Sequence, residues 1–213
     1  MLEHLPRTVP ADPGRPDLAD DRRPIRAVTR QVAFEPGAWS PERAERVAEL
    51  FDGLASSWHE RPAAFRFEAV DDALARGGPF PAGPALEVGS GTGLVTPRLA
   101  ARLTPLVSID LSAGMLAAAP PDAIRLRADS STLPIRDRAA SVVALVNMFL
   151  FPAEVDRVLA PGGVLVWINT LGDATPIHLP ATDVAAALPG DWDGLAADAG
   201  WGSWATFRRT SAG

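Results

Sequence analysis

The most constraining feature of this 213-residue chain is an apolar stretch that runs directly into three closely spaced glycines. Residues 85–93 are Ala-Leu-Glu-Val-Gly-Ser-Gly-Thr-Gly. Glycine tolerates the left-handed backbone of a sharp turn and leaves backbone N–H groups open to a ligand. Asp110 lies 21 residues beyond Gly89, the separation at which an acid ending the next strand accepts hydrogen bonds from ribose hydroxyls. The pattern predicts a nucleoside-binding site.

The positions of the glycines narrow the choice of nucleoside. A dinucleotide fingerprint requires glycines at positions i, i+2 and i+5, but Leu94 and Thr96 stand where the last glycine would fall. Glu87, inside the strand, would repel a phosphate and suit a cation. A nicotinamide dinucleotide is therefore disfavoured, and a positively charged ligand is favoured. The alternative is a glycine turn that only joins a strand to a helix.

The run Glu87-x-Gly89-x-Gly91-x-Gly93 resembles the first motif of class I S-adenosylmethionine-dependent methyltransferases, and the resemblance extends from about Phe51 to the C-terminus. It implies a Rossmann-like α/β fold, with a mostly parallel sheet, a C-terminal antiparallel hairpin and an N-terminal helical cap. It also implies S-adenosyl-L-methionine as the cofactor and S-adenosyl-L-homocysteine as the product.

Carried over residue by residue, the resemblance implies a set of cofactor-binding positions. Asp110 would hold the ribose, Asp129 would accept from the exocyclic amine of adenine, and Asn147 would face the sulfonium. The full set is Glu87, Gly89, Ser90, Gly91, Gly93, Asp110, Leu111, Met115, Asp129, Ser130 and Asn147. A solvated loop acid is the alternative interpretation of Asp129.

The chain changes character near residue 40. Residues 1–39 are rich in Pro, Arg and Asp without sustained periodicity, which predicts a flexible arm. Residues 40–213 are expected to form one domain, with a helical cap over 40–80, a cofactor-binding core over 84–170, and a helix plus hairpin over 171–213. Ser40 caps the first expected helix, whose apolar face includes Val47, Leu50, Phe51 and Leu54.

Alternating strands and helices after residue 85 predict a parallel sheet. A second cap helix is expected over 64–74. The expected strands are 85–89, 106–110, 124–128, 141–146 and 163–169, the hairpin strands 195–199 and 204–208, and the helices 95–103, 113–118, 153–159 and 181–188.

A second resemblance concerns the acceptor. Residues 51–59 resemble the N-terminal helix of small-molecule, quinone-type methyltransferases, in which the pattern is Phe-Asp-x-x-Ala-x-x-Tyr-Asp; here Trp58 and His59 replace the last pair. His178 follows the fifth strand, where the loop borders the acceptor in this family, and is the candidate general base, although an ordinary polar role remains open. The expected substrate pocket contains Phe51, Trp58, His59, Phe149, Thr170 and Trp201.

Composition excludes several function classes. A net charge of −6 and a pI near 5.1 argue against a nucleic-acid partner. The absence of Cys excludes a thiolate nucleophile, and the absence of Lys excludes the lysine-centred tetrad of RNA ribose methylation. No metal site is expected. The longest apolar run is too short to span a bilayer and no signal peptide is evident, so a cytoplasmic protein is expected.

These observations favour methyl transfer to a small-molecule acceptor, with the oligomeric state left open. One alternative is a non-methylating S-adenosylmethionine-binding relative, because Ser141 stands where the family usually has Asp and the connection from Asn147 to Pro161 is short. Another is a scaffold whose arm recruits a partner.

Overall fold

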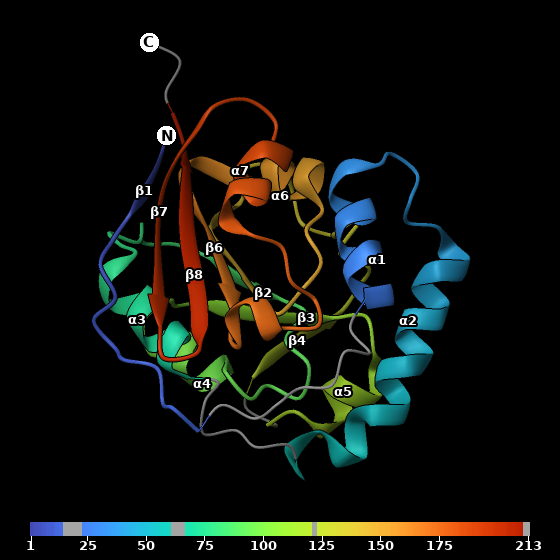
Figure 1. Cartoon of the computed structure of the whole chain (residues 1–213). Helices are drawn as coiled ribbons and strands as arrows, with labels where there is room; N and C mark the ends of the chain where they lie inside the picture. The colour runs from blue at the N-terminus through green and yellow to red at the C-terminus, as the bar shows by residue number, and fades with distance from the viewer. Residues whose placement is uncertain (15–22, 61–66, 121–122, 211–213) are drawn as a thin grey trace.

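The computed structural model describes residues 1–14, 23–60, 67–120 and 123–210. An eight-stranded sheet in the order β1-β7-β8-β6-β5-β2-β3-β4 forms the centre, with helices on both faces (Figure 1). The strands are β1 (Leu2–His4), β2 (Ala85–Val88), β3 (Leu106–Asp110), β4 (Ile124–Arg127), β5 (Ala140–Val146), β6 (Leu159–Asn169), β7 (Trp192–Ala199) and β8 (Gly202–Arg209).

The sheet is parallel except at β8, which pairs antiparallel with both β6 and β7. This arrangement confirms the prediction of a mostly parallel sheet with a C-terminal antiparallel hairpin. Because β2 to β6 run in one direction, their carboxyl ends meet at a single edge, which is where open α/β sheets bind ligands.

The helices and 3-10 turns follow the predicted order. They are α1 (Arg23–Phe34), α2 (Pro41–Leu54), η1 (Ala55–Glu60), α3 (Glu68–Arg76), α4 (Thr96–Ala100), α5 (Ala113–Ala118), α6 (Pro152–Val158), η2 (Gly172–Ala174) and α7 (Ala181–Ala187). The Ser40 hydroxyl accepts the Arg43 N–H, so the predicted N-cap of α2 is confirmed. Part of the helix expected over 64–74 lies outside the described residues.

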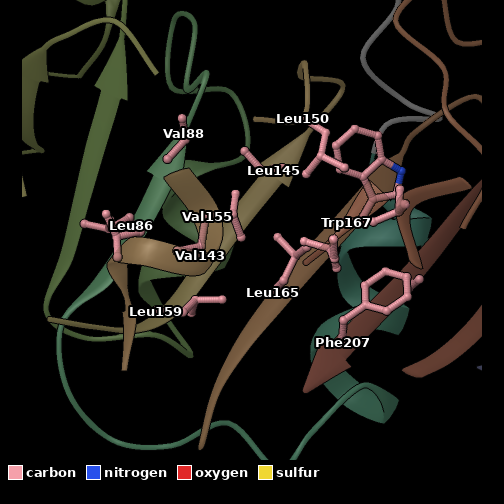
Figure 2. Close-up of a cluster of buried hydrophobic side chains, with 14 of the residues drawn as sticks. Leu86, Val88, Val143, Leu145, Leu150, Val155, Leu159, Leu165, Trp167 and Phe207 are labelled. Carbon is pink, nitrogen blue, oxygen red and sulfur yellow. The ribbon is translucent and has the colours of Figure 1, made fainter. Parts of the chain in front are cut away.

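Burial on both faces of the sheet explains why its central strands are almost continuously apolar. On one face, α6 and α7 pack against a cluster that includes Leu86, Val143, Leu165, Trp167 and Phe207 (Figure 2). On the other face, α3 and α4 cover a second cluster formed by alternate residues of the same strands. The sheet edge is thereby held rigidly between two packed layers.

Two local predictions differ from the structure. Leu50, expected on the buried face of α2, is 51% exposed, because this helix buries its alanines Ala44 and Ala48 instead. The β6 strand begins at Leu159 rather than at residue 163, because Leu159 pairs with Ala140 before a register shift.

The prediction that residues 1–39 form a flexible arm is wrong for two stretches. The β1 strand pairs in parallel with β7, and α1 packs Val32 beside Phe149 and Ile177. Ile25, Val28 and Val32 have helical spacing, but prolines and arginines around them obscure the pattern. Contacts with distant parts of the chain therefore order β1 and α1, although the local sequence does not predict them.

Within the described residues, no helix combines the length and hydrophobicity that a membrane crossing requires. The same part of the chain contains no group of three or more His, Asp or Glu side chains placed to hold a metal ion.

Candidate functional site

The glycine turn follows β2 at the carboxyl edge of the sheet. Gly89, Gly91 and Gly93 have φ angles of 76°, 56° and 75°, in the left-handed region that side chains disfavour. A Cβ on Gly93 would lie 2.9 Å from Pro120 Cδ, and one on Gly89 would collide with Met148. The turn therefore requires glycine for both conformation and space. Ser90, within it, is buried.

Asp110 ends β3 beside this turn. Its carboxylate accepts the N–H of Gly91 at 2.7 Å and the N–H of Ser112 at 2.8 Å. Burial is the largest influence on Asp110 and raises its pKa above the usual value, against these two hydrogen bonds. Met115 is fully buried on α5 below the turn, and Leu111 is partly buried. The predicted ribose acid and glycine turn are thus joined directly.

Glu87 lies in the middle of β2 and is only 1% exposed. Its Oε2 accepts hydrogen bonds from Thr96 Oγ1 at 2.6 Å and Ser108 Oγ at 2.8 Å. Its Oε1 is buried and has no donor among the described residues. Burial raises the pKa of Glu87 to about 7, so the carboxyl is partly protonated at neutral pH.

The sequence analysis did not identify Thr96 and Ser108 as partners of Glu87. Ser108 is the register partner of Glu87 across the β2–β3 pair, so a hydroxyl at this position was the signal available. A small polar residue inside an apolar strand is informative when the neighbouring strand carries a buried acid.

Asp129 follows β4 and is bound by a residue that the sequence analysis also missed. The indole N–H of Trp39 donates to both carboxylate oxygens of Asp129, at 3.1 and 3.0 Å, and the Ser131 N–H donates to Oδ1 at 2.8 Å. The Trp39 ring packs against Phe149 and Phe151, with centroid distances of 5.6 and 5.2 Å. Trp39 comes from the connection between α1 and α2.

Asn147 follows β5 and has a φ angle of 51°. Its Nδ2 donates to Thr170 Oγ1 and its Oδ1 accepts the Thr170 N–H, both at 2.8 Å. These two bonds join the carboxyl ends of β5 and β6. Ser130, predicted beside Asp129, is buried.

The residues predicted for the substrate pocket do not form one group. Phe51 and Trp58 lie ring to ring at 5.9 Å, and Phe51 and Phe149 belong to the same apolar cluster. Trp201 lies elsewhere, in the β7–β8 turn, where its indole N–H donates to the Asp12 carbonyl at 2.5 Å. The side chain of His59 lies outside the described residues.

A cavity of about 760 Å³ lies beside the β7–β8 hairpin, and we call it the hairpin cavity. Its lining includes Trp167, Asn169, His178, Ala181, Ala196 and Trp201. His178 is half-buried, and burial, followed by the nearby charge of Arg26, lowers its pKa. The imidazole is therefore neutral at neutral pH. His178, the predicted candidate base, and Trp201 both line this cavity.

The segment that carries the glycine turn and the acids is similar to known proteins. Residues 86–167 match the family model of a methyltransferase domain. This segment, which carries the glycine turn, Glu87 and Asp110, is therefore similar to a methyltransferase domain. No curated protein matches the chain at a significant level.

Solved structures of other proteins share the fold of this chain. The DhpI complex with S-adenosylhomocysteine aligns with a TM-score of 0.62 and 21% identity, over 79% of this chain and 97% of that one. A methyltransferase from Aquifex aeolicus aligns with a TM-score of 0.59 and 16% identity, over 73% and 96%. The [4+2]-cyclase SpnF aligns with a TM-score of 0.50 and 21% identity, over 59% and 60%.

Proposed function

We propose that this chain transfers a methyl group from S-adenosylmethionine to a small-molecule acceptor. The observation that carries the proposal is the contact between the glycine turn and Asp110, in which the Gly91 N–H meets the carboxylate at 2.7 Å. The match of residues 86–167 to a methyltransferase domain supports it. The similarity of residues 51–59 to the quinone-type N-terminal helix supports a small acceptor of that kind.

Each acid at this edge would bind a different part of the cofactor. Asp110 would accept from the ribose hydroxyls, and Asp129 would accept from the exocyclic amine of adenine. Glu87 would stabilise the ammonium of the methionine part, because its Oε1 has no donor among the described residues. Leu111 and Met115 would flank the purine.

The remaining predicted positions complete this site. Gly89, Ser90, Gly91 and Gly93 would form the backbone surface below the methionine part, and Ser130 would add an N–H at the purine. Asn147 would face the sulfonium; its side chain is fixed by two hydrogen bonds to Thr170.

The chemistry requires mainly correct positioning. When bound, S-adenosylmethionine supplies an electrophilic methyl group attached to a sulfonium. Holding two reactants in line lowers a barrier by about 7–11 kcal/mol in favourable cases. His178 is the base we propose for an acceptor that retains its proton, because its lowered pKa keeps the imidazole able to accept at neutral pH.

Two measurements test the function. Calorimetry should detect S-adenosylmethionine binding to the full chain, and mass spectrometry should detect S-adenosylhomocysteine when the chain is incubated with a metabolite panel. Absence of binding would refute the proposal as a whole. Binding without product over a broad panel would instead favour the alternative described below.

The role of His178 has its own test. His178→Ala should lower turnover on the order of 100-fold while cofactor affinity stays unchanged. Wild-type turnover should fall as pH drops through the lowered pKa of His178, since the imidazolium cannot accept a proton. The pH profile of the variant should be flat in that range. Equal turnover in both proteins would remove His178 from the mechanism.

The alternative function is that of a non-methylating S-adenosylmethionine-binding relative. Ser141 stands where the family usually has Asp, and its hydroxyl donates to the Pro84 carbonyl at 2.9 Å. This side chain therefore serves the packing of β5 against the connection to β2. The fold itself does not discriminate, because the [4+2]-cyclase SpnF also shares it.

A further inference from the structure

The hairpin cavity has walls from four parts of the chain. Trp167 and Asn169 lie on the same face of β6, and Asn169 is in register with Ser203 of β8. Ala181 from the start of α7 and His178 also line the cavity, and Asp12 lines it from the N-terminal stretch. Its volume of about 760 Å³ lies in the range of small-molecule sites.

Asn169 provides the specific sign of a ligand. The side chain is 2% exposed, and its Nδ2 donates to the Leu179 carbonyl at 3.2 Å. Its Oδ1 is buried and has no donor among the described residues. Buried acceptors in folded proteins are almost always paired. A molecule in this cavity that carries an N–H or O–H would satisfy Asn169.

The tryptophans of the lining supply ring surfaces rather than further donors. The indole N–H of Trp167 donates to the Leu179 carbonyl at 3.0 Å, and that of Trp201 to the Asp12 carbonyl at 2.5 Å. The N–H of Trp204 donates to Asp72 at 2.6 Å. All three N–H groups have protein partners, so no indole donates to a ligand. Trp201 is the most exposed of the three, at 6% against 1% for Trp167 and Trp204, and its ring would favour an aromatic ligand.

The charged groups of the lining disfavour an anion. Three carboxylates, those of Asp12, Asp173 and Asp198, line the cavity together with one guanidinium, that of Arg7. Arg7 bonds Asp198 at 3.0 Å and the Gly200 carbonyl at 2.6 Å, so its charge is compensated within the protein. Arg26 lies beside Asp173, so the charge of that carboxylate is left out of the balance, and Asp12 then gives the described part of the lining one carboxylate in excess. A carboxylate or phosphate ligand would be repelled.

The cavity is connected to the cofactor edge through one residue. Asn169 is followed by Thr170, which is bonded twice to Asn147. Asn147 is the position at which the sulfonium would lie under the proposed function. A ligand that donates to Asn169 is therefore held near the end of the cofactor that carries the methyl group.

We propose that the hairpin cavity binds an alcohol or an amine that carries an aromatic ring, with its O–H or N–H donated to Asn169, and that this molecule is the methyl acceptor. The proposal rests on the proposed function for the transfer step. In that step the acceptor oxygen or nitrogen forms a bond to the methyl carbon, and the carbon–sulfur bond breaks with its electron pair going to sulfur. The acceptor's proton, held on Asn169 Oδ1 before the transfer, leaves that hydrogen bond and passes to His178, which also lines the cavity.

Three probes that share one ring test the ligand class on the full chain. They are 2-phenylethanol, phenethylamine and phenylacetate, with affinities measured by NMR titration. The alcohol and the amine should bind, and the acid should bind at least tenfold more weakly. Asn169→Leu removes the buried acceptor and should weaken the alcohol and the amine at least tenfold, with cofactor affinity unchanged.

A second variant covers the case in which Asn169→Leu does not fold. Ala181→Trp places a bulky side chain on the half-buried rim of the cavity and should abolish probe binding. Its control is Ala186→Trp, at an exposed position of the same helix outside the lining, which should bind the probes like the wild type.

Two results would overturn the proposal: phenylacetate binding as tightly as the alcohol, or full probe affinity in both Asn169→Leu and Ala181→Trp. Failure of the proposed function is a separate result. It would appear as absent cofactor binding or absent product, while probe binding at the cavity persists.

Discussion

Two carboxylates at the same sheet edge are held in very different ways. Asp110 is bonded by the backbone N–H groups of Gly91 and Ser112, which belong to the turn and helix adjoining its own strand. Asp129 receives one local N–H, from Ser131, and an indole N–H from Trp39, 90 residues away in the chain. The first acid is positioned by its neighbours in the fold, and the second is also tied to a covering segment.

Under the proposed function, this difference means that the two ends of the cofactor site are held by different parts of the chain. The contacts of Asp110 are compatible with further acceptance by its remaining lone pairs. At Asp129, an indole N–H and an adenine amine are donors of the same kind and would compete for the same oxygens. Under the proposed function, binding at the purine end would therefore depend on Trp39, in the connection between α1 and α2.

The largest effect is expected at Asp110. In Asp110→Asn, the amide NH₂ would face one of the two N–H donors, and charge-assisted bonds to the ribose would be lost. Affinity for S-adenosylmethionine should fall by about 4 kcal/mol, roughly 1000-fold. Calorimetry measures the loss. The control Asp137→Asn changes an exposed acid outside the site and should leave affinity unchanged. Equal affinity in all three proteins would contradict the assignment of Asp110.

A somewhat smaller effect is expected from Glu87, on the same side of the site as Asp110. Its pKa of about 7 in the folded chain lies above the usual 4.5, so the folded state holds the proton more tightly. The stability from protonated Glu87 is complete below pH 4.5 and is lost as pH rises through 7. Between pH 4.5 and 8 the loss amounts to about 3 kcal/mol.

Glu87→Gln replaces the carboxyl by a neutral group of the same shape and should remove this component of the pH dependence. Denaturant unfolding of both proteins at several pH values measures the difference between them. If the wild type and the variant lose stability in parallel from pH 4.5 to 8, the shifted pKa of Glu87 is wrong.

The smallest expected effect is that of Trp39 on cofactor affinity. It tests directly whether Asp129, unlike Asp110, is held by a distant segment. Trp39→Phe keeps a ring against Phe149 and Phe151 but removes the N–H that occupies Asp129. Affinity for S-adenosylmethionine should rise about tenfold, or about 1.4 kcal/mol, because one competing hydrogen bond to a charged group is gone. Trp192→Phe, in the hairpin, removes an indole N–H outside this site and serves as the control. Weaker binding in Trp39→Phe would show that Trp39 assists the cofactor.

The same contrast, between local and long-range contacts, separates the features that the sequence predicted from those that it did not. The strands, the glycine turn and Asp110 are encoded within short windows, and β3 and α5 have the predicted bounds. Periodicity and glycine spacing are local properties, so a single sequence is sufficient for them. The hairpin at the C-terminus was predicted for the same reason.

The features that were missed depend on contacts between distant segments. Nothing near Trp39 indicates that its indole meets Asp129, and the Pro-rich stretch around α1 and β1 conceals two ordered elements. The substrate pocket was predicted as one set because the family resemblance groups those residues, whereas Phe51 and Trp201 lie in different places. The residue types indicated aromatic contacts for Phe51 and Trp201, but only the fold shows which residues each one contacts.

The pairing of β1 with β7 has a consequence for how the chain acquires its structure. During synthesis, Leu2–His4 leaves the ribosome long before Trp192–Ala199 exists, so this part of the sheet is completed last. Until then, β7 would present an unprotected row of backbone amides to other chains. Residues 2–4 thus cover the exposed edge of β7. Their loss would first appear as aggregation rather than as reduced catalysis.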